Sequence, residues 1–133
     1  MKRLLTKFAL LLSILIPVCV VAGQEDEVNP ETEYLSQDQV TREDYNTMSE
    51  FGISYDECLN DTSRAEATNY NDPRRVVDVA MKKCAVKLEK LNDWLTEKRF
   101  PPSFRKGYIR KISGKSVRQV MPQVMFLMSA KPQ

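Results

Sequence analysis

Apolar residues recur every three or four positions in two long stretches of the chain. In residues 42–68 these positions are Tyr45, Met48, Phe51, Tyr55, Cys58 or Leu59, and Ala65. In the stretch from Pro73 to before Pro101 they are Val77, Met81, Cys84, Leu88, Leu91 and Leu95. This spacing is that of one face of an amphipathic helix. The pattern therefore predicts two helices, with residues 69–73 between them as a turn.

Polar residues and prolines mark where these helices should begin and end. Asp72 followed by Pro73 is a strong helix start, because Asp accepts from free backbone N–H groups and Pro is tolerated in the first turn. The consecutive prolines at 101 and 102 should stop the second helix. The sequences Ser36-x-x-Gln39 and Thr41-x-x-Asp44 are further helix-start signals.

Two cysteines lie at matching places in the predicted helix pair. Cys58 lies 13 residues before Asn71 and Cys84 lies 13 residues after it. In an antiparallel hairpin that turns near Asn71, both therefore reach the same height, where a disulfide can join them. Such a bond should stabilise the fold by roughly 3–4 kcal/mol. The alternatives are a bridge between two chains or a metal site. One cysteine pair without histidine cannot build the usual four-ligand zinc site, and we expect no metal or other cofactor.

The last third of the chain gives weaker signals. Ser103 can start a short helix, residues 113–115 should interrupt it, and Ser116 can start another in which Pro122 introduces a kink or sets the true start. The alternative is a strand hairpin that turns at residues 113–114. We favour helices. The expected fold is all-α, a hairpin or bundle of three to four helices with one disulfide, formed as a single domain by residues 41–133.

The N-terminus has the order of features found in secretory signal peptides. Lys2, Arg3 and Lys7 precede an apolar run over residues 8–21, and the small residues Ala22 and Gly23 follow it. We expect residues 1–23 to be removed, with cleavage after Ala22 or Gly23. The protein is then secreted or periplasmic, and residues 24–40 form a flexible acidic segment.

Two other interpretations of the N-terminus are less favoured. A transmembrane anchor needs about 20 apolar residues, whereas this run is shorter and contains Pro17. A lipoprotein signal would use Cys19, but Val18 stands where that signal has a small residue. We therefore expect no transmembrane anchor after cleavage.

Charge divides the rest of the chain into two halves. Residues 24–72 contain 14 acidic and 2 basic residues, whereas residues 73–133 contain 15 basic and 4 acidic residues. The precursor's net charge of +2 hides this division. Such an asymmetry indicates an interaction between oppositely charged surfaces and says little about fold.

The basic charge is densest in residues 98–118, which contain no acidic residue. The eight cations are Lys98, Arg99, Arg105, Lys106, Arg110, Lys111, Lys115 and Arg118. They are interleaved with Phe100, Phe104 and Tyr108, a pattern typical of anion binding. Three interpretations remain open. The cations can pair with the protein's own acidic half, which we favour. They can bind an anionic envelope surface or polymer, although we expect no nucleic acid there. They can also bind another envelope protein, as an inhibitor or immunity-type protein does.

The composition argues against an enzyme. The chain has no histidine, which excludes Ser–His and Cys–His nucleophile pairs. Glu57 and Asp61 are like charges at i,i+4 spacing, which is typical of a solvated helix face. A hydrolase that uses carboxylates or Ser and Lys is the least favoured function. We expect a non-catalytic exported interaction protein of undetermined oligomeric state.

Three methionines, Met121, Met125 and Met128, share one predicted helical stripe. Thioethers can bind Cu(I). Because Val120, Val124, Phe126 and Leu127 surround them, core packing or an apolar docking surface is the preferred interpretation.

Overall fold

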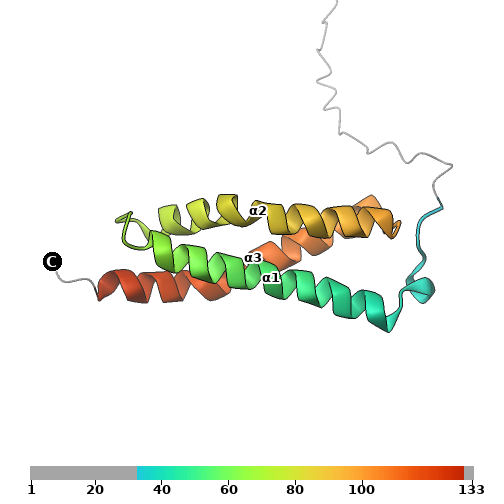
Figure 1. Ribbon diagram of the computed structural model, residues 1–133, viewed down its shortest axis with the longest axis horizontal. Coiled ribbons are helices and arrows are strands. Elements are labelled where there is room, and N and C mark those ends of the chain that lie inside the picture. Colours follow the sequence, from blue (N-terminus) through green and yellow to red (C-terminus); the bar gives the residue numbers. More distant parts are fainter. Residues whose placement is uncertain (1–32, 131–133) are drawn as a thin grey trace, which may run out of the picture.

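The computed structural model describes residues 33–130, and it is built from three long helices. They are α1 (Arg42–Glu66), α2 (Pro73–Glu97) and α3 (Pro102–Ser129), preceded by a short 3₁₀ turn at Gln37–Gln39 (Figure 1). The predicted all-α fold is confirmed. The predicted signal peptide, residues 1–23, lies outside the described residues. Among the described helices, none combines the length and hydropathy needed to cross a bilayer.

The first two helices form the predicted antiparallel hairpin, and their starts use the predicted caps. Thr41 accepts the backbone N–H of Asp44 at 3.1 Å, and the Asp44 carboxylate accepts the N–H of Thr41 at 2.9 Å. At the start of α2, the Asp72 carboxylate accepts the N–H of Arg74 at 2.9 Å. These bonds satisfy N–H groups that a helix start leaves without partners. The cap residues therefore fix where both helices begin.

Cys58 and Cys84 form the predicted disulfide between α1 and α2, with their Cα atoms 6.0 Å apart. Cys84 is fully buried, and Tyr55, Leu59 and Val77 belong to the same core cluster. The prediction from equal spacing about the turn is confirmed. Because the bond joins the middle of both helices, it fixes the register in which they pack.

The last third is one continuous helix, which corrects two details of the prediction. Residues 113–115 do not interrupt α3, and the helix begins at Pro102 rather than after a Ser103 cap. Pro122 lies inside the helix. The strand-hairpin alternative is wrong for these residues. A glycine inside a helix costs only about 1 kcal/mol relative to alanine. The burial of Val120 and Val124 against the hairpin outweighs that cost.

A second core cluster lies at the other end of the hairpin, where the chain enters α1 and leaves α2. Its buried members are Met48, Leu91, Leu95 and Phe100, and Leu35 and Val40 pack against them. The Leu35 N–H also donates to the carbonyl of Arg99 at 2.8 Å. Residues 35–40 therefore dock on the helices, a contact that the sequence analysis did not anticipate.

Candidate functional site

The α3 helix gathers five cations of the basic segment on its solvent-exposed side. Each of the five side chains is exposed, and we call them the basic face: Lys106, Arg110, Lys111, Lys115 and Arg118. Their spacing places them within about half of the helix circumference. The other half of α3 carries the buried residues Ser116, Val120 and Val124. Packing against the hairpin therefore turns the cations outward.

No acidic residue balances this charge on α3 itself, because residues 98–133 contain neither Asp nor Glu. Within residues 33–130 two ion pairs form, Glu66–Lys83 and Asp44–Lys98, and neither includes a residue of the basic face. Asp56 of α1 and Lys115 line the same hollow of about 240 Å³ without pairing. The cations of the basic face are thus left to the solvent or to a partner outside the described residues.

Lys98 differs from the basic face because it serves the fold. Its ammonium group lies 3.0 Å from Oδ1 of Asp44 and 5.7 Å from the ring centre of Trp94. The hydrogen bond to Asp44 raises the pKa of Lys98. Hydrogen bonds from Thr41, then the Lys98 ammonium, lower the pKa of Asp44 to about 2. Lys98 therefore forms an ion pair with a residue of the acidic half, as expected for the basic segment.

Arg99 and Arg105 are also held by local contacts. Arg99 adopts a φ of 60°, in the left-handed region, and its carbonyl accepts the N–H of Leu35. The Arg105 guanidinium donates to the hydroxyl of Thr96, and its buried Nε has no hydrogen-bond partner within residues 33–130. The side chain of Arg105 is only partly exposed. Three of the eight predicted binding residues thus have roles in the connection between α2 and α3.

The aromatic residues of the basic segment stack on one another. Ring centres are 6.0 Å apart for Trp94–Phe100, 5.0 Å for Phe100–Phe104 and 5.7 Å for Phe104–Tyr108. Phe100 is buried, and desolvation raises the pKa of the partly buried Tyr108. The interleaved aromatics therefore pack on one another as part of the fold.

The methionine stripe divides between the core and the surface. Met121 and Met128 pack against the core cluster around the disulfide, which supports the core-packing interpretation. Met125 is 56% exposed, next to Phe126 and Leu127. Phe126, which the sequence analysis placed in the same apolar group, is 73% exposed. One helix cannot turn every residue of the apolar run 124–128 toward the hairpin, because successive side chains point in different directions.

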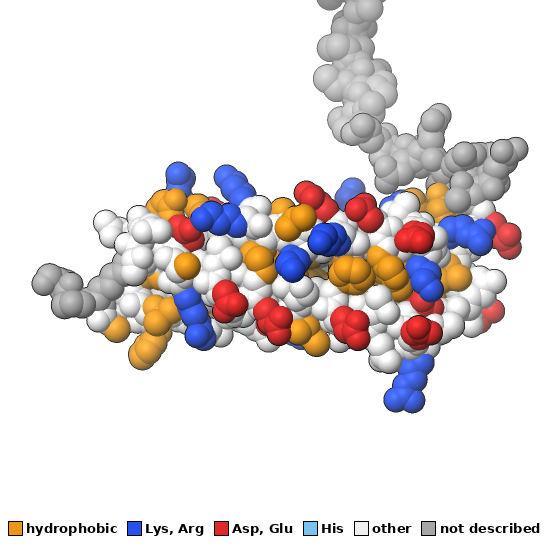
Figure 2. Space-filling model, in the orientation of Figure 1, with side chains coloured by type: hydrophobic (Ala, Val, Ile, Leu, Met, Phe, Trp, Pro, Cys, Tyr) orange, Lys and Arg blue, Asp and Glu red, His pale blue; other side chains and the backbone are white. Residues whose placement is uncertain are grey.

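The described surface carries its charges unevenly. The face over α1 and α2 shows acidic and basic side chains intermixed (Figure 2). On α1, seven acidic residues accompany two basic ones, whereas α3 has six basic residues and no acidic one. A partner that binds α3 must therefore tolerate or supply negative charge.

Comparison with known proteins gave no match: neither a family model, nor a curated protein, nor a solved structure is similar to this chain.

Proposed function

We propose that this chain is an exported, non-catalytic binding protein whose basic face engages an anionic partner. One observation carries the proposal. Five exposed cations occupy one side of α3, and no carboxylate of residues 33–130 pairs with them. Several cations on one rigid helix attract a polyanion more strongly than scattered charges do, because their potentials add. The helix holds them in place before a partner arrives.

The signal-like N-terminus and the disulfide support the exported location. Disulfides persist in oxidising compartments such as the periplasm. The protein then meets anionic lipid headgroups and envelope polymers far more often than nucleic acid. Binding of this kind requires no catalytic residue, which agrees with the lack of histidine in the chain.

Heparin affinity of the exported protein, recovered from the periplasm, tests the proposal. The wild type should be retained at low salt and released by a salt gradient, because exposed ion pairs are screened by salt. A variant that neutralises part of the basic face should elute at clearly lower salt: K106Q/K111Q/K115Q. Failure of the wild type to bind at low salt would refute the proposal.

A matched control removes the same charge from α2. Lys82, Lys87 and Lys90 form no ion pair within residues 33–130. The variant K82Q/K87Q/K90Q should elute close to the wild type. If both triple variants shift equally, net charge rather than the basic face governs retention, and the proposal fails.

A further inference from the structure

The C-terminal turns of α3 expose a cluster of large apolar side chains. Met125 is 56% exposed, Phe126 73% and Leu127 40%. We call these three residues the apolar tip. It lies at the end of the molecule where α1 turns into α2, and orange side chains are visible on the surface there (Figures 1 and 2). Three such residues in one helical turn form a patch, unlike isolated exposed apolar residues, which are common.

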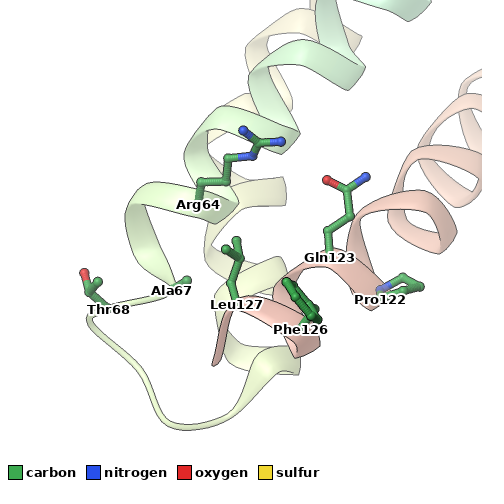
Figure 3. Close-up of a pocket in the computed structure, with 7 residues that line it drawn as sticks. All are labelled: Arg64, Ala67, Thr68, Pro122, Gln123, Phe126 and Leu127. Carbon is green, nitrogen blue, oxygen red and sulfur yellow. The ribbon is translucent and has the colours of Figure 1, made fainter. Parts of the chain in front are cut away.

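An open, mainly apolar hollow of about 690 Å³ adjoins the apolar tip. Phe126, Leu127 and Pro122 of α3 line one side, and Ala67 and Thr68 at the end of α1 line the other (Figure 3). Arg64 adds a cation to the lining. The surface at this end is thus apolar with a positive charge beside it.

Met125 continues the basic face along the same side of α3, Phe126 lies beside that side, and Leu127 faces the hollow next to the end of α1. Lys111, Lys115, Arg118, Pro122 and Met125 follow one another at steps of three or four residues, and all five are exposed. Such steps keep side chains on one helix face. Arg118 precedes Met125 by about 10 Å along the axis, at 1.5 Å per residue. One exposed stripe therefore changes from cationic to apolar toward the end of the helix.

The change from cationic to apolar side chains along α3 favours one kind of partner for the apolar tip over another. A second copy joined along the stripe would bring two basic faces together, and α3 has no carboxylate to compensate. An anionic bilayer instead offers phosphates at its surface and hydrocarbon a few ångströms deeper. Cations followed by Phe, Met and Leu match that layering.

We propose that α3 docks the protein on an anionic phospholipid bilayer. Met125 and Phe126 enter the boundary between headgroups and acyl chains, and Lys111, Lys115 and Arg118 contact lipid phosphates. This inference rests on the proposed function and names its partner. Docking is peripheral and reversible, because two partly inserted side chains bury little area compared with a spanning helix.

Co-sedimentation with lipid vesicles tests the inference. The exported protein should bind vesicles containing phosphatidylglycerol and should not bind vesicles of phosphatidylcholine alone. The variant M125S/F126S should bind the anionic vesicles at least about tenfold more weakly, since it removes most of the inserted apolar area. Its retention on heparin should be unchanged, because the basic face is intact. The matched control I53S/V86S changes two exposed apolar residues on α1 and α2 and should bind vesicles like the wild type.

Each remaining outcome has a defined meaning. Retention on heparin without binding to phosphatidylglycerol vesicles refutes bilayer docking and leaves the proposed function standing. Equal vesicle binding by the wild type and M125S/F126S refutes insertion of the apolar tip. If the wild type sediments as a dimer without lipid and M125S/F126S as a monomer, the apolar tip joins two copies and the inference is overturned. Failure to bind both heparin and vesicles refutes both proposals.

Discussion

The ammonium group of Lys98 lies 3.0 Å from Oδ1 of Asp44 and so ties the end of α2 to the start of α1. The other oxygen of the same carboxylate accepts the N–H of Thr41 at 2.9 Å and its hydroxyl at 2.7 Å. Asp44 therefore caps α1 and anchors Lys98 at once. The most N-terminal cation of the basic segment consequently stabilises the fold, whereas the basic face of α3 forms no ion pair within residues 33–130.

This pair predicts a dependence of stability on acid pH. Thr41 and Lys98 lower the pKa of Asp44 from 3.8 to about 2, so the folded state favours the ionised carboxylate. Its contribution is complete above about pH 4 and is lost as the pH falls toward 2. Thermal unfolding followed by circular dichroism between pH 2 and 5 should show a weaker pH dependence in D44N than in the wild type.

The control for this experiment is E43Q, which changes the exposed carboxylate next to Asp44. It should keep the slope of the wild type. Equal slopes for D44N and E43Q would show that the cap and ion pair of Asp44 do not set the acid dependence. Glu66, whose pKa is lowered by Lys83 and Asn69, leaves a residual slope in every variant.

The disulfide should supply a large part of the stability. It closes a loop with a sequence separation of 26 residues between Cys58 and Cys84. Replacing both cysteines, C58A/C84A, should lower the free energy of unfolding by roughly 3–4 kcal/mol, since the unfolded chain gains conformational freedom. Urea denaturation measures this difference. The mass of the unreduced wild type should be lower than that of the reduced form by two hydrogen atoms, and equal masses would contradict the bond.

Gly107 offers a test of the helical assignment of α3. It lies in the exposed part of the helix, and a Cβ added there would meet nothing within 4 Å. The substitution Gly107→Ala should therefore stabilise the protein by about 0.5–1 kcal/mol, the difference in helix propensity. Thermal denaturation measures the change. A loss of stability would be inconsistent with helix at this position.

Arg99 combines a basic side chain with a left-handed backbone conformation. Two substitutions distinguish the effect of the charge from the effect of the backbone. At a φ of 60°, a Cβ costs roughly 1–2 kcal/mol, which glycine avoids. R99G should therefore be more stable than R99A by about 1 kcal/mol in urea denaturation. Because both variants lose the same charge, they should elute together from heparin. Equal stability would show that the turn does not need the left-handed conformation.

The hairpin was predictable from sequence because several local signals agree. The apolar stripes, the caps at Thr41 and Asp72, and the cysteines at equal distances from the turn all specify the same antiparallel pair. In α3 the local signals conflict with the outcome. Gly114 and Pro122 weaken a helix, and only the burial of Val120 and Val124 against the hairpin decides in its favour. Burial of that kind depends on residues far away in the sequence.

The sequence predicted that residues 98–118 are rich in cations, but not which of these cations face the solvent. The sequence cannot show that Lys98 reaches Asp44, that Arg105 reaches Thr96, or that Phe100 packs against Trp94. These contacts hold side chains of the basic segment against the rest of the fold. The helix spacing does show which cations share a side of α3, once the helix is known to be continuous.

The acidic N-terminal segment provides the last prediction, because the chain enters the helices where α3 begins. Leu35 bonds to Arg99, and α3 starts at Pro102. The carboxylates at 25, 26, 27 and 31 precede this docked segment in the sequence, and a short covalent link between opposite charges raises their effective concentration. We therefore predict that they compete with external anions for the basic face. Neutralising them should remove a competitor and raise the salt at which the protein leaves heparin. The variant is E25Q/D26N/E27Q/E31Q.

A matched variant separates tethered competition from net charge. E50Q/E57Q/D61N/E89Q neutralises four exposed carboxylates of α1 and α2 that form no ion pair within residues 33–130. Both variants change the net charge equally, and long-range repulsion from heparin is largely screened at 0.1 M salt. We expect the N-terminal variant to elute at higher salt than this control. Coincident elution would show that the N-terminal carboxylates do not pair with the basic face, which would then be fully available to an external anion.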